Sequence, residues 1–128
     1  MSSVFTKIIN RELPAQIVYE DEQTIAFLDI RPVSRGHTLV VPKVEVDQFQ
    51  DLDVDTYTTL MQTVHYVARI IKTKLQPQRV GVVIYGFDVP HVHVQLIPMD
   101  KPGLIQFQHG EEVAPEELAD VRAELVGD

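Results

Sequence analysis

The stretch VGVVIYGFDVPHVHVQLIP, residues 80–98, does most to decide the fold. Two runs rich in β-branched residues flank the tripeptide Gly86-Phe87-Asp88. β-Branched side chains favour strands, and a short glycine-containing connection is typical of antiparallel neighbours. The stretch therefore predicts two antiparallel strands, Val80–Tyr85 and Val89–Pro98, joined by a short loop.

The rest of the chain predicts further strands and helices without a regular βαβ alternation. Apolar residues recur at steps of three and four over Asp53–Leu75, which indicates a long amphipathic helix. The other expected elements are helices over Ser3–Glu12 and Pro115–Val126, and strands over Gln16–Glu20, Thr24–Asp29, His37–Pro42 and Leu104–Phe107. Strand groups on both sides of one long helix favour an α+β fold, with an antiparallel sheet of about five strands and short terminal helices. Neither a GxGxxG nor a P-loop pattern occurs.

Composition limits the classes of protein that this chain can belong to. Its 128 residues suit one core, so we expect a single domain over residues 1–128. The absence of cysteine excludes disulfides, thiolate metal ligands and a thiol nucleophile. A formal net charge of −8 opposes the binding of polymeric nucleic acid or of anionic membranes. We find no targeting segment and no membrane-spanning run, and we expect a cytoplasmic protein.

A row of polar residues stands out in the last predicted strand. His91, His93 and Gln95 alternate with apolar residues, so on a strand they would project from one face, each about 7 Å from the next. Three interpretations are open. Imidazoles two residues apart are common zinc ligands, although a third strong ligand is missing here. His93 is alternatively a nucleophile that attacks phosphorus. Buried histidines bonded to the backbone are the third interpretation, and the preferred one for His65 and His109.

The residues around this row resemble a known family. The order His-φ-His-φ-Gln-φ-φ at 91–97 is similar to the signature of the histidine triad (HIT) family, His-φ-His-φ-His-φ-φ. VFTKIINRELPAQIVYEDEQTIAFLDIRPVSRGHTLVVPK, residues 4–43, resembles the family's N-terminal half in order and spacing. The resemblance covers roughly residues 3–100 and leaves a C-terminal extension from about residue 101. It implies a HIT-like α+β fold, a homodimer with combined sheets, an AMP-like purine nucleotide as ligand, and metal-free, cofactor-free hydrolysis or transfer at the α-phosphate.

The same resemblance implies roles for individual residues. His93 would be the nucleophile, and His91 would contact the phosphate or the leaving group. His37 would hydrogen-bond within the histidine cluster and fix the tautomers of its neighbours. Asp29 would accept both ribose hydroxyls, a task suited to a carboxylate. Four apolar side chains would form the walls of the base pocket, namely Phe5, Ile8, Phe27 and Ile30. Gly86, in a loop, would bring backbone close to the ligand.

Three departures from the family pattern bear on function. Gln95 replaces the third histidine, as in the transferase branch of the family. This replacement removes a proton shuttle. Together with His91 and backbone amides, Gln95 would stabilise charge on the phosphoryl oxygens. The loop before the signature is short and carries Asp88, an acid that either repels an anion or orients a histidine. Ser3 and Thr6 stand where many bacterial relatives have a zinc-binding Cys-x-x-Cys pair, so we expect no zinc there.

These observations predict a nucleotide hydrolase that acts on a phosphoramidate or a dinucleoside polyphosphate. The reaction would pass through a covalent nucleotidyl-His93 intermediate, which water then hydrolyses. Gln95 keeps open a nucleotidyltransferase or phosphorylase. A nucleotide-binding regulatory module with little turnover is the alternative from a different functional class, and a metal enzyme is the weakest.

Overall fold

A computed structural model describes residues 2–103 and 110–127 of the chain. Its elements follow in the order α1 (Val4–Ile9), β1 (Ile17–Glu20), β2 (Thr24–Leu28), β3 (Thr38–Pro42), a 3-10 turn η1 (Phe49–Asp51), α2 (Val54–Leu75), β4 (Arg79–Val83), β5 (Val94–Met99) and α3 (Pro115–Val126). None of the helices in these two ranges is both long enough and apolar enough to cross a membrane.

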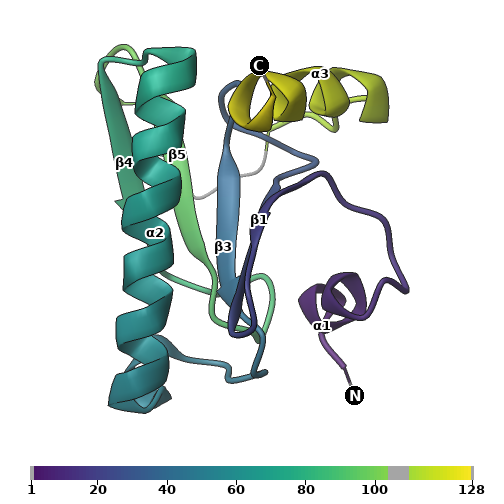
Figure 1. The fold of residues 1–128 in the computed structure, drawn as a ribbon, viewed down its shortest axis with the longest axis vertical. Coiled ribbons are helices and arrows are strands. Elements are labelled where there is room, and N and C mark those ends of the chain that lie inside the picture. Colours follow the sequence, from purple (N-terminus) through teal and green to yellow (C-terminus); the bar gives the residue numbers. More distant parts are fainter. Residues whose placement is uncertain (1, 104–109, 128) are drawn as a thin grey trace.

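The five strands form one antiparallel sheet, ordered β1-β2-β3-β5-β4. β5 lies between β3 and β4, because the connection through α2 carries the chain past β5 to the edge of the sheet. The long helix α2 runs along one face of the sheet, and α3 lies across the end near β1 (Figure 1). This arrangement confirms the predicted α+β fold with a long central helix.

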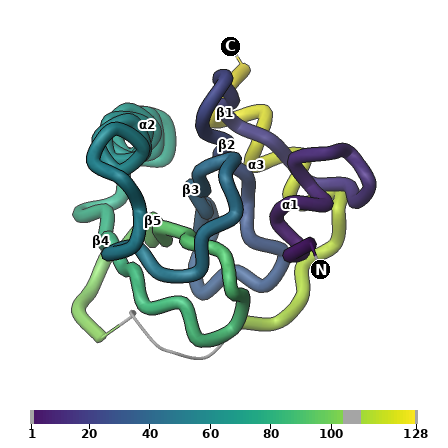
Figure 2. The backbone as a smooth tube through the Cα atoms, turned by 90° about the horizontal axis from the view of Figure 1, so that it is seen from below, coloured from purple at the N-terminus to yellow at the C-terminus, as the bar shows by residue number. Residues whose placement is uncertain are grey.

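Both faces of the sheet are covered. Alternate residues of β2 and β3 face opposite sides, as the twofold period of a strand requires. Ala26, Leu28 and Val40 pack in the core beneath α2 and α3. Ile25, Phe27, Leu39 and Val41 pack instead with α1 through Phe5 and Ile8. Figure 2 shows α2 and α1 on opposite sides of the strands.

The caps of α2 explain where this helix begins and ends. The Asp53 side chain accepts a hydrogen bond from the Thr56 backbone N–H, which satisfies one of the free donors at the helix start. The helix ends at Leu75, because Gln76 takes a left-handed conformation with φ of 56°. The predicted limits of this helix and of α3 are confirmed to within one residue.

Other predicted boundaries differ from the structure. α1 ends at Ile9, three residues before the predicted end, because the chain turns at Arg11, which has a φ of 64°. β5 begins at Val94, so His91 and His93 precede the strand in irregular backbone rather than forming part of it. The predicted strand Leu104–Phe107 lies outside the described residues.

Candidate functional site

His93 lies in the connection between β4 and β5, with its side chain almost completely buried. Its Nδ1 is 2.8 Å from the backbone oxygen of His91. A carbonyl oxygen only accepts hydrogen bonds, so Nδ1 carries a proton and donates it. Nε2 is therefore the atom that supplies the lone pair when the ring is neutral. The Phe5 ring meets this imidazole edge-on, with 5.0 Å between ring centroids, and holds its plane.

Asp88 closes the other side of the His93 ring. Its Oδ1 is 3.1 Å from His93 Nε2, and its side chain is 28% exposed. The same oxygen accepts the backbone N–H of Val89, which keeps the carboxylate turned toward the ring. The sequence left open whether this acid repels a ligand or orients a histidine. In the structure it contacts Nε2 of the histidine to which the resemblance assigns the role of nucleophile.

His91 is buried, and both of its ring nitrogens are hydrogen-bonded within the protein. Nε2 donates to the Pro42 carbonyl oxygen at 2.8 Å, and Nδ1 lies 2.7 Å from Ser3 Oγ. Burial lowers the pKa of His91, which favours the neutral ring, so the Ser3 hydroxyl donates to Nδ1. The resemblance implied contact with phosphate, but in this arrangement neither nitrogen is available to a ligand. The geometry instead favours a positioning role, in which His91 holds its own carbonyl against His93.

His37 and Gln95 form a second hydrogen-bonded pair. The backbone N–H of Val33 donates to His37 Nδ1 at 3.1 Å, which places the proton of the ring on Nε2. Nε2 then donates to Gln95 Oε1 at 3.0 Å. The Gln95 amide thereby has a fixed orientation, and it also hydrogen-bonds the Tyr85 hydroxyl, whose pKa is raised mainly by burial. His37 thus hydrogen-bonds the glutamine of the row.

An apolar cavity of about 510 Å³ lies beside this centre. It brings together five residues that the resemblance assigns to the nucleotide, and it also includes Asp88: the five are Phe5, Ile8, Phe27, Asp29 and Ile30. Asp29 Oδ1 accepts the Arg31 backbone N–H at 2.9 Å, and Oδ2 lies 3.7 Å from His37 Nε2. An apolar cavity with one carboxylate suits a nucleoside, because the carboxylate can accept hydrogen bonds from the ribose hydroxyls.

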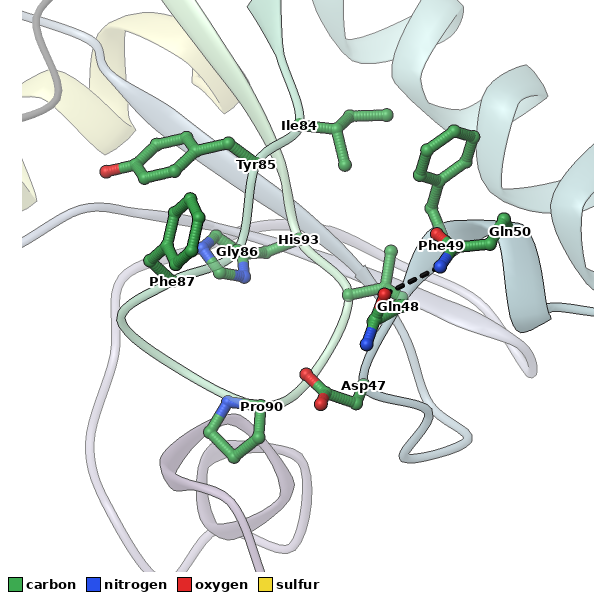
Figure 3. Close-up of a pocket in the computed structure, with 11 residues that line it drawn as sticks. Asp47, Gln48, Phe49, Gln50, Ile84, Tyr85, Gly86, Phe87, Pro90 and His93 are labelled. Atoms are coloured by element: carbon green, nitrogen blue, oxygen red, sulfur yellow. Dashed lines mark hydrogen bonds between the residues drawn. The ribbon is translucent and has the colours of Figure 1, made fainter.

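A second cavity, of about 430 Å³, is lined by His93 itself, and no pattern in the sequence predicted it. Figure 3 shows Tyr85 and Phe87 on one side of it and Phe49 and Gln50 on the other, with the Asp47 carboxylate directed inward. Gly86 lines this cavity rather than the apolar cavity that contains Phe5 and Asp29. Gly86 has a φ of 71°, a conformation that favours glycine, and this turn brings the loop across His93.

Hydrogen bonds join the residues that stand at the family's zinc positions. Ser3 N–H and Thr6 Oγ1 both donate to Glu45 Oε1, at 2.7 and 2.6 Å, beside the contact of Ser3 with His91. These donors lower the pKa of Glu45, the backbone N–H of Ser3 most of all. No group of three or more metal-binding side chains occurs within residues 2–103 and 110–127.

Of the two remaining histidines, one falls within the described residues. His65 is exposed on α2, so the prediction that it is a buried histidine is wrong. His109 lies outside the described residues. Sequence reasoning missed Ser3 as a hydrogen-bond partner of His91 and missed Tyr85 beside Gln95. The Ser3-x-x-Thr6 pattern at the start of a helix was the available signal for Ser3, but such a pattern predicts a helix cap rather than a contact with a distant histidine.

Comparison with known proteins first shows to which class of fold the structure belongs. The structure superimposes on that of a HIT-like protein from Bartonella henselae with a TM-score of 0.88, at 29% identity, over 97% of this chain and 93% of the other. A model of the HIT domain matches residues 10–102. The chain belongs to the HIT domain family.

Two curated relatives illustrate the similarity to other members of the family. An uncharacterized HIT-like protein of Methanocaldococcus jannaschii is 41% identical over 74% of this chain and 77% of its own length. An adenosine 5'-monophosphoramidase of Saccharomyces cerevisiae is 32% identical over 96% of this chain and 80% of its own length.

Proposed function

We propose that this protein hydrolyses purine nucleoside phosphoramidates at the α-phosphorus, through a covalent nucleotidyl-His93 intermediate. The observation that carries the proposal is the hydrogen bond from His93 Nδ1 to the His91 carbonyl, which leaves Nε2 as the nucleophilic atom. Nε2 contacts Asp88, and Asp88 lines the nucleoside-sized apolar cavity. The yeast relative named for the same reaction type supports the choice of substrate.

The reaction has two steps. The lone pair of His93 Nε2 forms a bond to phosphorus, and the bond from phosphorus to the amine nitrogen breaks. Water then attacks the same phosphorus, the bond to Nε2 breaks, and the nucleoside monophosphate leaves. Asp29 would bind the ribose hydroxyls, and Phe5 and Phe27 would contact the base. Covalent catalysis of this kind replaces one difficult displacement by two easier ones.

The test is metal-free hydrolysis that depends on His93. We expect the wild type to release AMP from adenosine 5'-phosphoramidate in the presence of a chelator, and His93→Ala to lose at least about 10³-fold in kcat/KM, since it lacks the nucleophile. His65→Ala, which removes an exposed histidine, is the matched control and should retain activity. Full activity of His93→Ala would contradict the proposal.

The choice of substrate and acceptor has its own assay. Diadenosine polyphosphate in place of the phosphoramidate tests the leaving group, and added inorganic phosphate tests the acceptor. ADP formed only with phosphate would identify a phosphorylase instead of a hydrolase. AMP binding without product from either substrate would identify a regulatory binding module.

We further propose that the protein is a homodimer formed through β4. This strand is at the edge of the sheet, and Val82 on it is 50% exposed. An edge strand offers backbone hydrogen-bonding groups to a second copy, and pairing of two such strands would combine the sheets. Phe87, in the loop that follows β4, is 93% exposed and adds apolar surface.

A further inference from the structure

His93, the proposed nucleophile, contacts Asp88, and the two steps of the proposed reaction assign no role to this contact. His93 Nδ1 faces the His91 carbonyl at 2.8 Å, and Nε2 faces the Asp88 carboxylate at 3.1 Å. Both ring nitrogens thus face oxygen acceptors, so a proton shared between Nε2 and Asp88 satisfies both contacts. This proton has to leave Nε2 before the lone pair can attack phosphorus.

Gln95 cannot accept that proton, since a side-chain amide does not exchange protons as an acid or base at neutral pH. Its two ends are also engaged, by His37 and by Tyr85. His91 offers no free nitrogen, because Pro42 and Ser3 occupy both. Of the described residues around His93, Asp88 is the titratable group in hydrogen-bond contact with Nε2.

We propose that Asp88 is a catalytic residue that carries the proton in both steps of the reaction, an inference that rests on the proposed function. In the first step Asp88 takes the proton from Nε2, and Nε2 bonds to phosphorus. As the phosphorus–nitrogen bond breaks, its electron pair goes to the amine nitrogen, which takes the proton from Asp88. The products of this step are a neutral amine, the nucleotidyl-histidine and an ionised Asp88.

The second step uses the same carboxylate as a base. Asp88 takes a proton from water, and the resulting hydroxide oxygen bonds to phosphorus. The phosphorus–Nε2 bond breaks with its electron pair returning to the ring, and Asp88 passes the proton back to Nε2. The monophosphate leaves, and the starting pair of protonated ring and carboxylate is restored, with charge and protons balanced.

Other charged groups border Asp88 and will influence this transfer. Asp29 and Arg31 line the same cavity, and the Tyr85 hydroxyl feels the charge of Asp88. The backbone N–H of Val89 donates to Asp88 Oδ1 and holds the carboxylate beside the ring. The substrate phosphoryl group also has to enter beside Asp88, so the side chain must shift while staying within reach of the leaving nitrogen.

The test compares leaving groups in Asp88→Asn. An alkylamine phosphoramidate of AMP needs a proton on its leaving nitrogen, and we expect kcat to fall by about 10²–10⁴-fold, the usual contribution of general acid–base catalysis. The p-nitrophenyl ester of AMP loses its phenolate without a proton. With this ester we expect Asp88→Asn to release about one phenolate per site in a burst and then stall, with nucleotidyl-His93 visible by mass spectrometry.

Two further variants separate the possible outcomes. Asp88→Glu keeps a carboxyl group and should recover part of the activity with the amine substrate. Asp51→Asn is the matched control, because it removes the same charge from an exposed acid that lines neither cavity, and it should behave as wild type. Retained AMP binding by Asp88→Asn shows that the variant is folded.

The proposal would be overturned if Asp88→Asn hydrolysed the amine substrate at the wild-type rate, or if it lost activity equally with both substrates and formed no burst. The proposed function would still stand in either case, provided that His93→Ala is inactive. Failure of the wild type to form nucleotidyl-His93 from either substrate would instead reject the proposed function.

Discussion

At the scale of single residues, the buried His91 makes stability depend on pH. Burial lowers its pKa in the folded state, while the unfolded chain keeps the ordinary value of about 6.5. Between these two values the unfolded state binds the additional proton. The free energy of unfolding should therefore fall as the pH drops below about 6.5, by at most about 1.4 kcal/mol per pH unit from this group.

Urea unfolding at several values between pH 8 and pH 5 measures this effect. We expect the wild type to lose stability over this range and His91→Gln to lose less, because glutamine does not titrate. His65→Gln removes an exposed histidine and should keep the wild-type slope. Equal slopes for the wild type and His91→Gln would show that His91 does not contribute.

Single residues also show how much of the site can be predicted from the sequence. His93 is identifiable from its pattern, because alternation of histidine with valine is unusual for a core strand. The hydrogen bonds that give the site its protonation pattern join residues far apart in the chain, such as Ser3 with His91 and His37 with Gln95. These pairs are determined by the register of the folded sheet and by the position in which α1 packs against it.

At the scale of elements, α1 is a short helix that is attached directly to the histidine centre. Ser3 caps the helix by accepting the Thr6 N–H and also donates to His91. Ser3→Ala removes both interactions, and we expect a loss of about 1–2 kcal/mol of stability. Activity should fall as well, because Phe5 on this helix packs against His93.

Thermal or urea unfolding and kcat/KM with adenosine 5'-phosphoramidate together measure this coupling. Ser2→Ala alters the exposed neighbouring serine and serves as the control, with no change expected in either quantity. A destabilised Ser3→Ala variant with unchanged kcat/KM would show that α1 supports the fold but not the site.

Elements were predictable wherever a periodic pattern coincided with a cap or a breaker. α2 and α3 fall within one residue of their predicted limits, because Asp53 and Pro115 mark their starts. The 3-10 turn η1 and the irregular backbone at His91 carry no such pattern. His91 leaves the strand because its side chain and its carbonyl bond to Pro42 and His93, which no local pattern records.

At the scale of the whole molecule, the edge strand β4 predicts self-association. Val82→Lys places a charge on this strand, and lysine on an edge opposes pairing with another strand. We expect this variant to be a monomer by size-exclusion chromatography with light scattering, while the wild type is a dimer. Val44→Lys introduces the same charge at an equally exposed valine outside β4 and should stay dimeric. A monomeric wild type would reject the interface.

The segment 84–93 has a consequence for how such an enzyme can diversify. It carries the proposed nucleophile, the acid that contacts it, and the glycine that turns the loop, between the edge strand β4 and the strand β5, whose Val94 and Leu96 belong to the core. Its attachment to the scaffold through His91 requires only a backbone carbonyl and a serine hydroxyl. Val92 of this segment lies in the core and Ile84 packs against it, so a segment with other reactive groups would have to keep these two apolar side chains.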